Sequence, residues 1–339
     1  MRKIVAPPPV RALEPGPTPT FAILIATYQA AATIVECVDS ALAQTLPAQE
    51  VILIDDGSTD GTENALAPYG SSITYIKQEN RGKAAAINRG AGLSTAEFVS
   101  ILDADDVYEP ERLEALSELA AARPDLDILM TDAYLEVESE IVGRFSDRTP
   151  FAIAKQSVAI FEDCYIAWPA LRRATLIAQG GFDESLRIAQ DWECWIRLLH
   201  SGCVAGLVDE PLLRYRIGRT SLSSDRMNAL RSRVHILELA SGLDLSPDER
   251  RALEHFLARR KQRLLVAEAE QALRGHDPEA RRRSIAVALA GGMPIAARLK
   301  ALAAAAAPRA AARRLAAIEA RTGHSRFERS IPSNPSARP

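Results

Sequence analysis

Residues 98–106 read Phe98-Val-Ser-Ile-Leu-Asp-Ala-Asp-Asp106, a short apolar run that ends in a cluster of acids. The run predicts a β-strand that is buried on both faces, and the acids predict a loop at the carboxyl end of that strand. Asp103 and Asp105 are separated by one residue, so in extended backbone their side chains point in the same direction. The two carboxylates can therefore converge on one bound group.

Four other short apolar runs also predict strands. They are residues 21–26, 51–54, 73–76 and 128–130. Between the runs, residues 31–44 and 109–122 place apolar side chains on one helical face. Strands that alternate with helices build βαβ units. We therefore predict an α/β fold with a mostly parallel central sheet flanked by helices.

Polar residues follow three of the predicted strands. Thr27 and Tyr28 follow the first strand, a loop rich in Asp and Gly from Asp55 to Thr62 follows the second, and the acids at residues 103–106 follow the fourth. Ligands of parallel sheets bind outside the carboxyl ends of the strands, so these residues predict one shared pocket. The loop at residues 55–62 could instead be a plain turn, because Asp-Gly pairs favour turns.

The acids at residues 103–106 favour a metal site. Mg²⁺ and Mn²⁺ prefer carboxylate oxygens, and they are commonly shared with the phosphates of a substrate. The structural alternative is that Asp106 caps a helix that begins near Pro110. Because Asp103 and Asp105 come directly after a buried strand, we expect Mn²⁺ or Mg²⁺ as the cofactor.

Two further segments carry candidate groups. Residues 80–90 place Arg81 and Lys83 beside a glycine and a helix start, which suits a diphosphate, although a basic helix start on the surface has the same pattern. Asp191 opens an amphipathic segment at residues 190–199. A carboxylate there is stabilised by the helix dipole, and it is also a candidate general base.

The composition of the chain and the positions of its prolines and glycines predict four parts. Six prolines in residues 1–20 indicate a disordered, extended arm and not a secretory signal. The α/β domain would occupy residues 21–224, a basic helical extension residues 225–325, and a disordered tail residues 326–339. No run of about 18 apolar residues predicts a membrane span. The four cysteines form no C-x-x-C pair, which favours reduced thiols in the cytoplasm.

Charge differs sharply between the two ends of the chain. Residues 226–339 carry 22 Lys and Arg against 11 Asp and Glu, a net charge of +11, whereas residues 1–225 have a net charge of −14. The acidic part would repel nucleic acid, so we expect no nucleic-acid partner. The basic helices could contact an anionic membrane or an acidic protein, or could pack on the α/β domain. We expect a cytoplasmic protein, with peripheral contact at the inner face of the membrane as one option.

Six segments, in this order along the chain, resemble the family 2 glycosyltransferases, which have the nucleotide-sugar-binding GT-A fold. They are Ile25-Ala-Thr-Tyr28, Leu53 to Thr62, Asn80 to Gly90, Leu102 to Asp106, Gly181-Phe-Asp-Glu184 and Gln190-Asp-Trp-Glu193. The resemblance covers about residues 21–216. It implies an inverting transfer of a sugar from a nucleotide-diphosphate donor, most commonly a UDP-sugar, to a saccharide or lipid-linked acceptor. Cell-surface polysaccharide or glycan synthesis is the implied setting.

The resemblance also implies roles for single residues. Asp191 would be the catalytic base, and Asp105 with Asp103 would hold the metal. The nucleotide-sugar would contact Thr27, Tyr28, Asp55, Asp56, Arg81, Lys83, Asp103 and Ala104. The acceptor would lie near Trp168, Asp183, Glu184 and Trp192. Trp168 could stack on a sugar ring or simply pack in the core.

Some positions depart from the family's pattern. Gln190 stands where the family commonly has an acid, and Lys83 stands where many relatives have proline. A histidine is missing after Tyr215-Arg216, where Arg216 or Arg219 could take its place.

Two other functions remain open. A sugar nucleotidyltransferase would carry a glycine-rich basic loop after the first strand, where this chain has Thr27-Tyr28-Gln29. A non-catalytic carbohydrate-binding or assembly protein on the same fold is the other alternative, which the missing acid at Gln190 keeps open.

Overall fold

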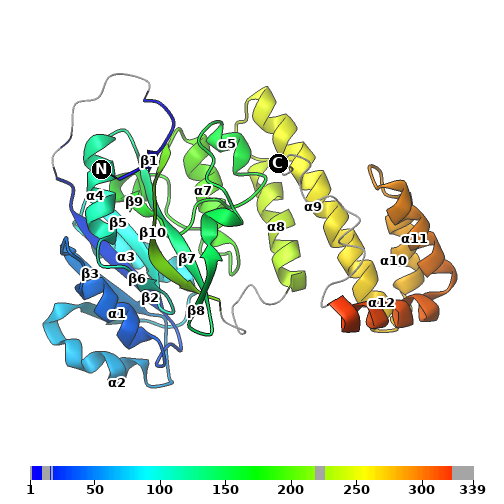
Figure 1. Ribbon diagram of the computed structural model, residues 1–339, viewed down its shortest axis with the longest axis horizontal. Helices are drawn as coiled ribbons and strands as arrows, with labels where there is room; N and C mark the ends of the chain where they lie inside the picture. The colour runs from blue at the N-terminus through cyan, green and yellow to red at the C-terminus, as the bar shows by residue number, and fades with distance from the viewer. Residues whose placement is uncertain (1, 10–15, 17, 218–225, 323–339) are drawn as a thin grey trace. The chain divides into compact units, whose positions relative to one another are not determined.

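The computed structural model describes residues 2–9, 16, 18–217 and 226–322 (Figure 1). The chain divides into an α/β unit, residues 1–222 with 242–250, and a helical unit, residues 223–241 with 251–339. The predicted tail at residues 326–339 lies outside the described residues.

Within the described residues, ten strands form one mixed sheet in the order β1-β10-β7-β9-β5-β2-β3-β4, with β6 paired to β10 and β8 to β7. The strands are β1 (Ile4–Val5), β2 (Phe21–Thr27), β3 (Glu50–Asp55), β4 (Thr74–Lys77), β5 (Phe98–Asp103), β6 (Val107–Tyr108), β7 (Ile128–Val137), β8 (Glu140–Arg144), β9 (Ala170–Arg172) and β10 (Ala205–Arg216). Strands β4, β3, β2 and β5 are parallel neighbours, and β10 is parallel to β7. The short β9 lies between β5 and β7 and is antiparallel to both, and the peripheral strands β1, β6 and β8 also pair antiparallel with their neighbours. The predicted α/β fold with a mostly parallel centre is confirmed.

Helices cover both faces of this sheet. They are α1 (Ile34–Leu42), α2 (Thr62–Leu66), α3 (Lys83–Leu93), α4 (Arg112–Ala122), α5 (Gln156–Ala159), α6 (Arg173–Ala178) and α7 (Gln190–His200). Successive residues of a strand point to opposite faces, so β2 contacts a different helix with each face. Ile23 faces the core shared with α1 and α4, whereas Leu24 lies against Gly90 of α3. A Cβ at Gly90 would approach the Leu24 side chain to 3.3 Å, so the glycine allows α3 to pack closely.

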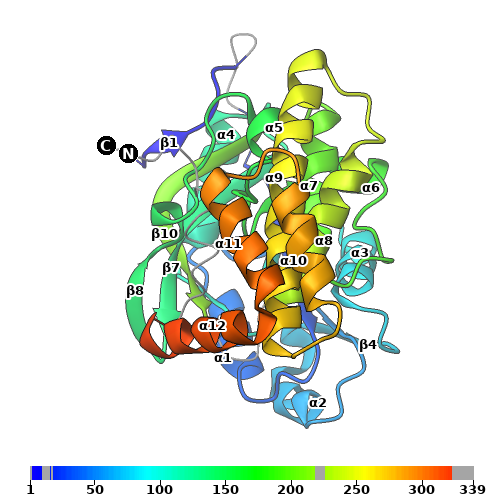
Figure 2. The same cartoon turned by 90° about the vertical axis from the view of Figure 1, so that its right-hand side faces the viewer.

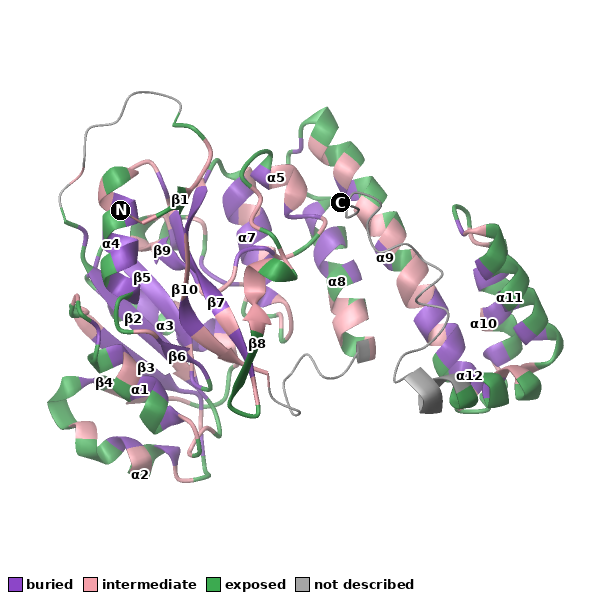
Figure 3. Ribbon diagram, in the orientation of Figure 1, coloured by how far each residue is buried: buried purple, intermediate pink, exposed green. Residues whose placement is uncertain are grey.

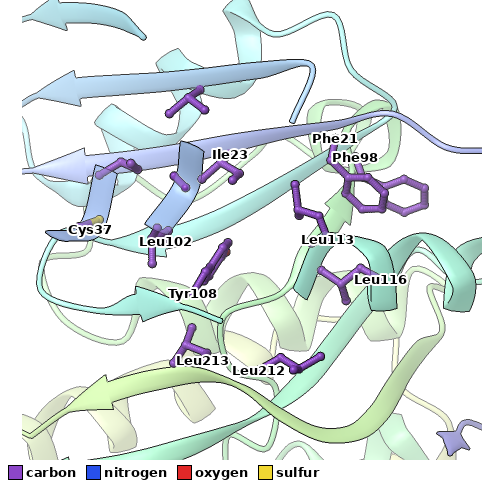
Figure 4. Packing of buried hydrophobic residues seen from close by; sticks show 14 of the residues in the cluster. Phe21, Ile23, Cys37, Phe98, Leu102, Tyr108, Leu113, Leu116, Leu212 and Leu213 are labelled. Atoms are coloured by element: carbon purple, nitrogen blue, oxygen red, sulfur yellow. The ribbon is translucent and has the colours of Figure 1, made fainter. Parts of the chain in front are cut away.

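The main hydrophobic core lies between the sheet and helices α1 and α4 (Figure 4). The rings of Phe21 and Phe98 stack there with centroids 5.5 Å apart. Tyr108 is also buried, and its hydroxyl group donates to the Ile101 carbonyl at 2.8 Å, so its polar end is satisfied. Because β5 is anchored on both sides by such contacts, the acids at its carboxyl end are held in place.

The prediction of a disordered arm at residues 1–20 is wrong for its first residues. Ile4–Val5 form β1, which pairs antiparallel with β10. Arg2 lies within 3.2 Å of three glutamates from α4 and β10, Glu114, Glu118 and Glu210. A two-residue edge strand shows no periodicity in the sequence, because its partners are supplied by strands and helices far along the chain.

The helical unit contains five helices in the described part of the chain. They are α8 (Arg226–Ala240), α9 (Pro247–Arg274), α10 (Ala280–Leu289), α11 (Ile295–Ala306) and α12 (Pro308–Thr322). Helices α10 and α11 lie side by side (Figure 2). Small side chains dominate the buried positions, with Val266, Ala269, Val287 and Ala301 in one cluster. No described helix is both long and apolar enough to cross a membrane.

We predict that Phe98→Ala lowers the free energy of unfolding of the α/β unit by about 3–5 kcal/mol, because it leaves a cavity in a closely packed core. The three tryptophans of the chain, Trp168, Trp192 and Trp195, all lie in this unit. Urea denaturation followed by tryptophan fluorescence therefore measures it. Ile177→Ala, at a position that is 47% exposed, is the control and should change little. Equal effects of the two substitutions would contradict the assigned core.

Candidate active site

Three carboxylates gather where β5 ends. The carboxylate oxygens of Asp103, Asp105 and Asp106 lie within 4.8 Å of one another. A tight turn makes this possible, because the Asp106 N–H donates to the Asp103 carbonyl at 3.0 Å and returns Asp106 towards the strand. Helix α4 begins only at Arg112, so Asp106 does not cap it and belongs to the acid cluster instead.

The three acids are held together against their mutual repulsion. Asp106 is fully buried, and its Oδ1 accepts the N–H of Arg216 at 3.0 Å, while its Oδ2 has no partner within the described residues. Desolvation, then repulsion by Asp103 and Asp105, raises the pKa of Asp106 well above its ordinary value. Desolvation and repulsion by Asp103 also raise the pKa of Asp105. A bound cation would relieve this repulsion, and three hard oxygen ligands fit Mg²⁺ or Mn²⁺.

Lys83, the first residue of α3, forms an ion pair with Asp103. Desolvation acts against its positive charge, but attraction by Asp103, with further contributions from Asp191 and Asp106, raises the pKa of Lys83. The lysine is therefore positively charged and electrostatically coupled to both Asp103 and Asp191. The structure thus joins the metal candidates and the base candidate, which are far apart in the sequence, through one ammonium group.

Asp191 lies in the first turn of α7 and is exposed. Its Oδ1 accepts the N–H of Trp192 at 2.8 Å. Ala189, just before the helix, has φ +61, a left-handed conformation that is uncommon for alanine. The buried neighbour Gln190, where an acid would be costly to desolvate, has no partner for its Oε1 in the described part of the chain.

The two adjacent aspartates after β3 are buried and hold loops. Asp55 accepts the Ser58 N–H at 2.8 Å and the Tyr75 hydroxyl group at 2.7 Å. Asp56 accepts the backbone N–H groups of Arg81 and Gly82 at 2.8 and 2.7 Å. Both carboxylates therefore fix the shape of the loops at the sheet edge, in addition to any contact with a nucleotide.

Thr27 ends β2 at the same edge of the sheet, and Tyr28 follows it. Thr27 is buried, and its hydroxyl group has no partner within the described residues, whereas Tyr28 is 54% exposed. The loop after them is tied to the loop after β3, because the Gln29 N–H donates to Ser58 Oγ at 2.9 Å and the Ala31 N–H donates to Asp60 Oδ2 at 3.0 Å. Tyr28 is therefore an exposed ring on a fixed backbone.

Arg81 and Glu184 form an ion pair of 2.7 Å across the site. Glu184 also accepts from Asn88 of α3 at 3.1 Å. Arg187 lies over Gly82, where a Cβ would come within 2.6 Å of its guanidinium nitrogen. Residues 181–187 are thereby joined to the start of α3, and Arg187 joins the basic groups at this edge.

Trp168 and Tyr215 form an aromatic contact near the acids. Their ring centroids are 4.8 Å apart, and Trp168 also makes an edge contact with Phe145. The Trp168 carbonyl accepts from the buried Arg112 guanidinium at 2.5 Å. Burial and the negative charges of Asp106, Asp103 and Asp105 raise the pKa of Tyr215. Trp168 thus packs against partly buried aromatic side chains beside the acid cluster.

Trp192 and Arg216, two of the positions singled out from the sequence, contact other groups of the protein. Trp192 was expected on the acceptor side, but it is 3% exposed and its indole N–H donates to the Ile160 carbonyl at 2.7 Å, so it packs inside the protein. The guanidinium group of Arg216 pairs with Glu36 and Glu136. Arg219 lies outside the described residues.

Asp183 accepts the Ser185 N–H at 2.8 Å in a local turn, and Ala104 is buried between the acids.

Residues 22–177 match the family model described as Glycosyl transferase family 2. Residues 22–177 therefore form a glycosyltransferase family 2 domain. An uncharacterized glycosyltransferase of Rickettsia typhi is 27% identical over 222 residues, which are 63% of this chain and 69% of the relative. The succinoglycan biosynthesis protein ExoO of Rhizobium meliloti is 32% identical over 194 residues, 53% of this chain and 55% of the relative. The chain thus spans about half of ExoO.

Two solved structures share the fold of this glycosyltransferase. S. aureus TarS 1–349 in complex with UDP-GlcNAc has a TM-score of 0.58 at 19% identity, covering 90% of this chain and 92% of that chain. The mannosyltransferase PcManGT from Pyrobaculum calidifontis, in complex with GDP-Man and Mn²⁺, has a TM-score of 0.57 at 23% identity, covering 92% and 87%. The expected GT-A fold is therefore confirmed.

Asp106, Tyr215 and Arg187 lie at the site without having been predicted as members of it from the sequence. Asp106 was visible as the last acid of the run at residues 103–106, but helix capping explained it equally well. Tyr215 and Arg187 lie far from that run along the chain, and no short-range spacing connects them with it. The pairing of β10 with β6 and β7 brings Tyr215 to the acids.

We predict that, at a pH at which Asp106 is ionised, Asp106→Asn stabilises the metal-free protein by about 1–3 kcal/mol, because the amide then removes one of three repelling charges and keeps the oxygen that accepts from Arg216. Thermal unfolding with a chelator should show a higher Tm than wild type, and adding Mn²⁺ should raise the Tm of the variant less than that of wild type. Glu140→Gln, at an exposed position on β8, is the control. A lower Tm for Asp106→Asn in chelator would contradict the repulsion described here.

Proposed function

We propose that this glycosyltransferase moves a sugar, with inversion, from a nucleotide-diphosphate donor to a saccharide or lipid-linked acceptor, in the synthesis of a cell-surface polysaccharide or glycan. The observation that carries the proposal is the coupling of three strand-end carboxylates, Lys83 and Asp191 at one edge of the sheet. The relationship to ExoO, which is named for succinoglycan biosynthesis, supports the polysaccharide setting.

The donor would bind across the loops that follow β2, β3 and β5. Tyr28 offers an exposed ring for the base, and the buried acids Asp55 and Asp56 hold the loops beside it. Thr27 offers a hydroxyl group that has no partner in the described part of the protein. Lys83 is placed to pair with the diphosphate, with Arg81 near it. A UDP-sugar is the first candidate, and the TarS complex with UDP-GlcNAc supports this choice.

Asp103, Asp105 and Asp106 would hold Mn²⁺ or Mg²⁺. Such an ion supplies positive charge to the diphosphate and stabilises it as a leaving group. The PcManGT complex contains Mn²⁺, which supports the choice of a divalent ion. Lys83 adds a second positive charge at the same edge, where the negative charge of the departing diphosphate would develop.

Asp191 would act as the general base. It takes the proton from an acceptor hydroxyl group, whose oxygen attacks the anomeric carbon from the side opposite the diphosphate. The bond between that carbon and the diphosphate oxygen breaks, and the oxygen keeps the electron pair. One displacement of this kind inverts the configuration. The acceptor side would include Trp168, Asp183 and Glu184, which lie on loops near the site.

Asp191→Asn is expected to lower kcat for sugar transfer by about 10²- to 10⁴-fold with little change in the donor KM, because it removes only the proton acceptor. Asp105→Ala should instead abolish the dependence of the rate on Mn²⁺. Donor consumption, with Glu140→Gln as the control, measures both effects. Normal donor consumption by both variants would show that these residues do not carry the reaction.

A nucleoside diphosphate that binds the site should stabilise the protein. At a concentration of about 100 Kd the stabilisation is about 2.7 kcal/mol, which is a Tm increase of roughly 5–10 °C. We expect UDP with Mn²⁺ to give a larger increase than GDP or ADP with Mn²⁺. No increase with any nucleotide, with or without metal, would contradict a nucleotide-sugar donor and favour a non-catalytic protein.

A further inference from the structure

Helices α10 and α11 carry an exposed apolar stripe. Ile295, Leu299 and Leu302 follow the spacing i, i+4, i+7, so they share one face of α11. Their exposures are 76%, 61% and 50%. Ile285 and Leu289 of α10, four residues apart, are 38% and 71% exposed. Figure 3 shows α11 largely in the colour of exposed residues.

This stripe is separate from the faces that pack inside the helical unit. Helix α10 buries Val287 and Ala288, and α11 buries Ala297 and Ala301. Arg298 Nε donates to the Ala288 carbonyl at 2.7 Å and so links the two helices. Each helix therefore has two apolar sides, and only one of them is buried by packing inside the helical unit. Of the fifteen large apolar side chains that are exposed among the described residues, five lie within residues 285–302.

Basic residues surround the stripe. Residues 280–318 contain eight Lys and Arg and no Asp or Glu. Arg281 and Arg282 precede Ile285 by four and three residues, so they lie on its face of α10, and both are exposed. Arg298 and Lys300 adjoin Leu299 on α11 and are exposed as well. An apolar stripe with arginines and lysines beside it is typical of a helix that lies in a membrane interface.

We infer that this surface, which we call the basic apolar face, docks onto a bilayer that contains anionic lipids. It consists of Arg281, Arg282, Ile285, Leu289, Ile295, Leu299 and Leu302. A second copy of the chain is disfavoured as the occupant, because it would bring two positively charged faces together, although Glu279 pairs with Arg282 at 2.8 Å on each of them. An anionic bilayer supplies both the negative charge and the apolar layer that the face lacks.

The inference does not depend on the proposed glycosyl transfer, because the residues of the basic apolar face take no part in it. The helices would lie parallel to the membrane plane, with leucine and isoleucine side chains at the boundary between headgroups and acyl chains. The arginines would remain at the level of the lipid phosphates.

Flotation of the full chain with vesicles tests this docking. Wild type should float with vesicles of phosphatidylcholine and phosphatidylglycerol, but not with phosphatidylcholine alone, and added salt should weaken the binding. Arg281→Gln and Arg282→Gln should each weaken binding by about fivefold, and Ile295→Ser with Leu299→Ser by at least about tenfold. Ile141→Ser with Val142→Ser, two residues of β8 that are 50% and 49% exposed, is the matched control and should bind as wild type does.

Two outcomes would overturn the inference. One is that wild type fails to float with phosphatidylglycerol vesicles, or floats equally well when both sets of residues are replaced. The other is an oligomer in light scattering that Ile295→Ser with Leu299→Ser converts to a monomer, with no vesicle binding, which would assign the face to a second copy. Circular dichroism checks that the variants remain folded. Donor consumption by the same samples reports on the proposed function separately.

Discussion

Repulsion among Asp103, Asp105 and Asp106 is the constraint on which the candidate active site depends. Carboxylates within 4.8 Å of one another, one of them fully buried, are unfavourable unless other groups compensate them. Lys83 pairs with Asp103, and the Arg216 N–H donates to Asp106. These two groups come from α3 and β10, so the compensation itself depends on the complete sheet. A divalent ion would complete it.

The parallel centre of the sheet explains why this repulsion can be maintained. Strand β5 lies between β2 and β9, with the stacked rings of Phe21 and Phe98 beneath it, so its end cannot easily withdraw from the cluster. The buried Asp56, which follows β3, also fixes part of the site. Its carboxylate accepts hydrogen bonds from the backbone N–H groups of Arg81 and Gly82, just before Lys83. Buried acids that fix loops and acids that would bind ligands thus occur side by side.

The helical unit differs from the α/β unit in the distribution of its apolar side chains. Its interior is made largely of alanine and valine, and its larger leucine and isoleucine side chains are partly on the surface beside arginines. A soluble helical bundle usually buries its largest apolar residues and exposes small or polar ones. On α10 and α11 this distribution is reversed, and the reversal supports the docking face that we propose.

The sequence by itself determined the α/β class, the strand ends and the placement of Asp103, Asp105 and Asp191, because these follow from local periodicity and spacing. It could not assign Asp106, because an acid that caps a helix and an acid that joins a cluster have the same local pattern. It could not assign Trp192 either, because a buried and an exposed tryptophan near a helix start also look alike in the sequence. Tertiary structure decided those cases: the turn after β5 returned Asp106 to the acids, and Ile160 provided the acceptor that buries Trp192. Likewise β1 exists only because β10 offers a free edge. Each of these positions depends on contacts with residues far away in the sequence, and no local sequence pattern records such contacts.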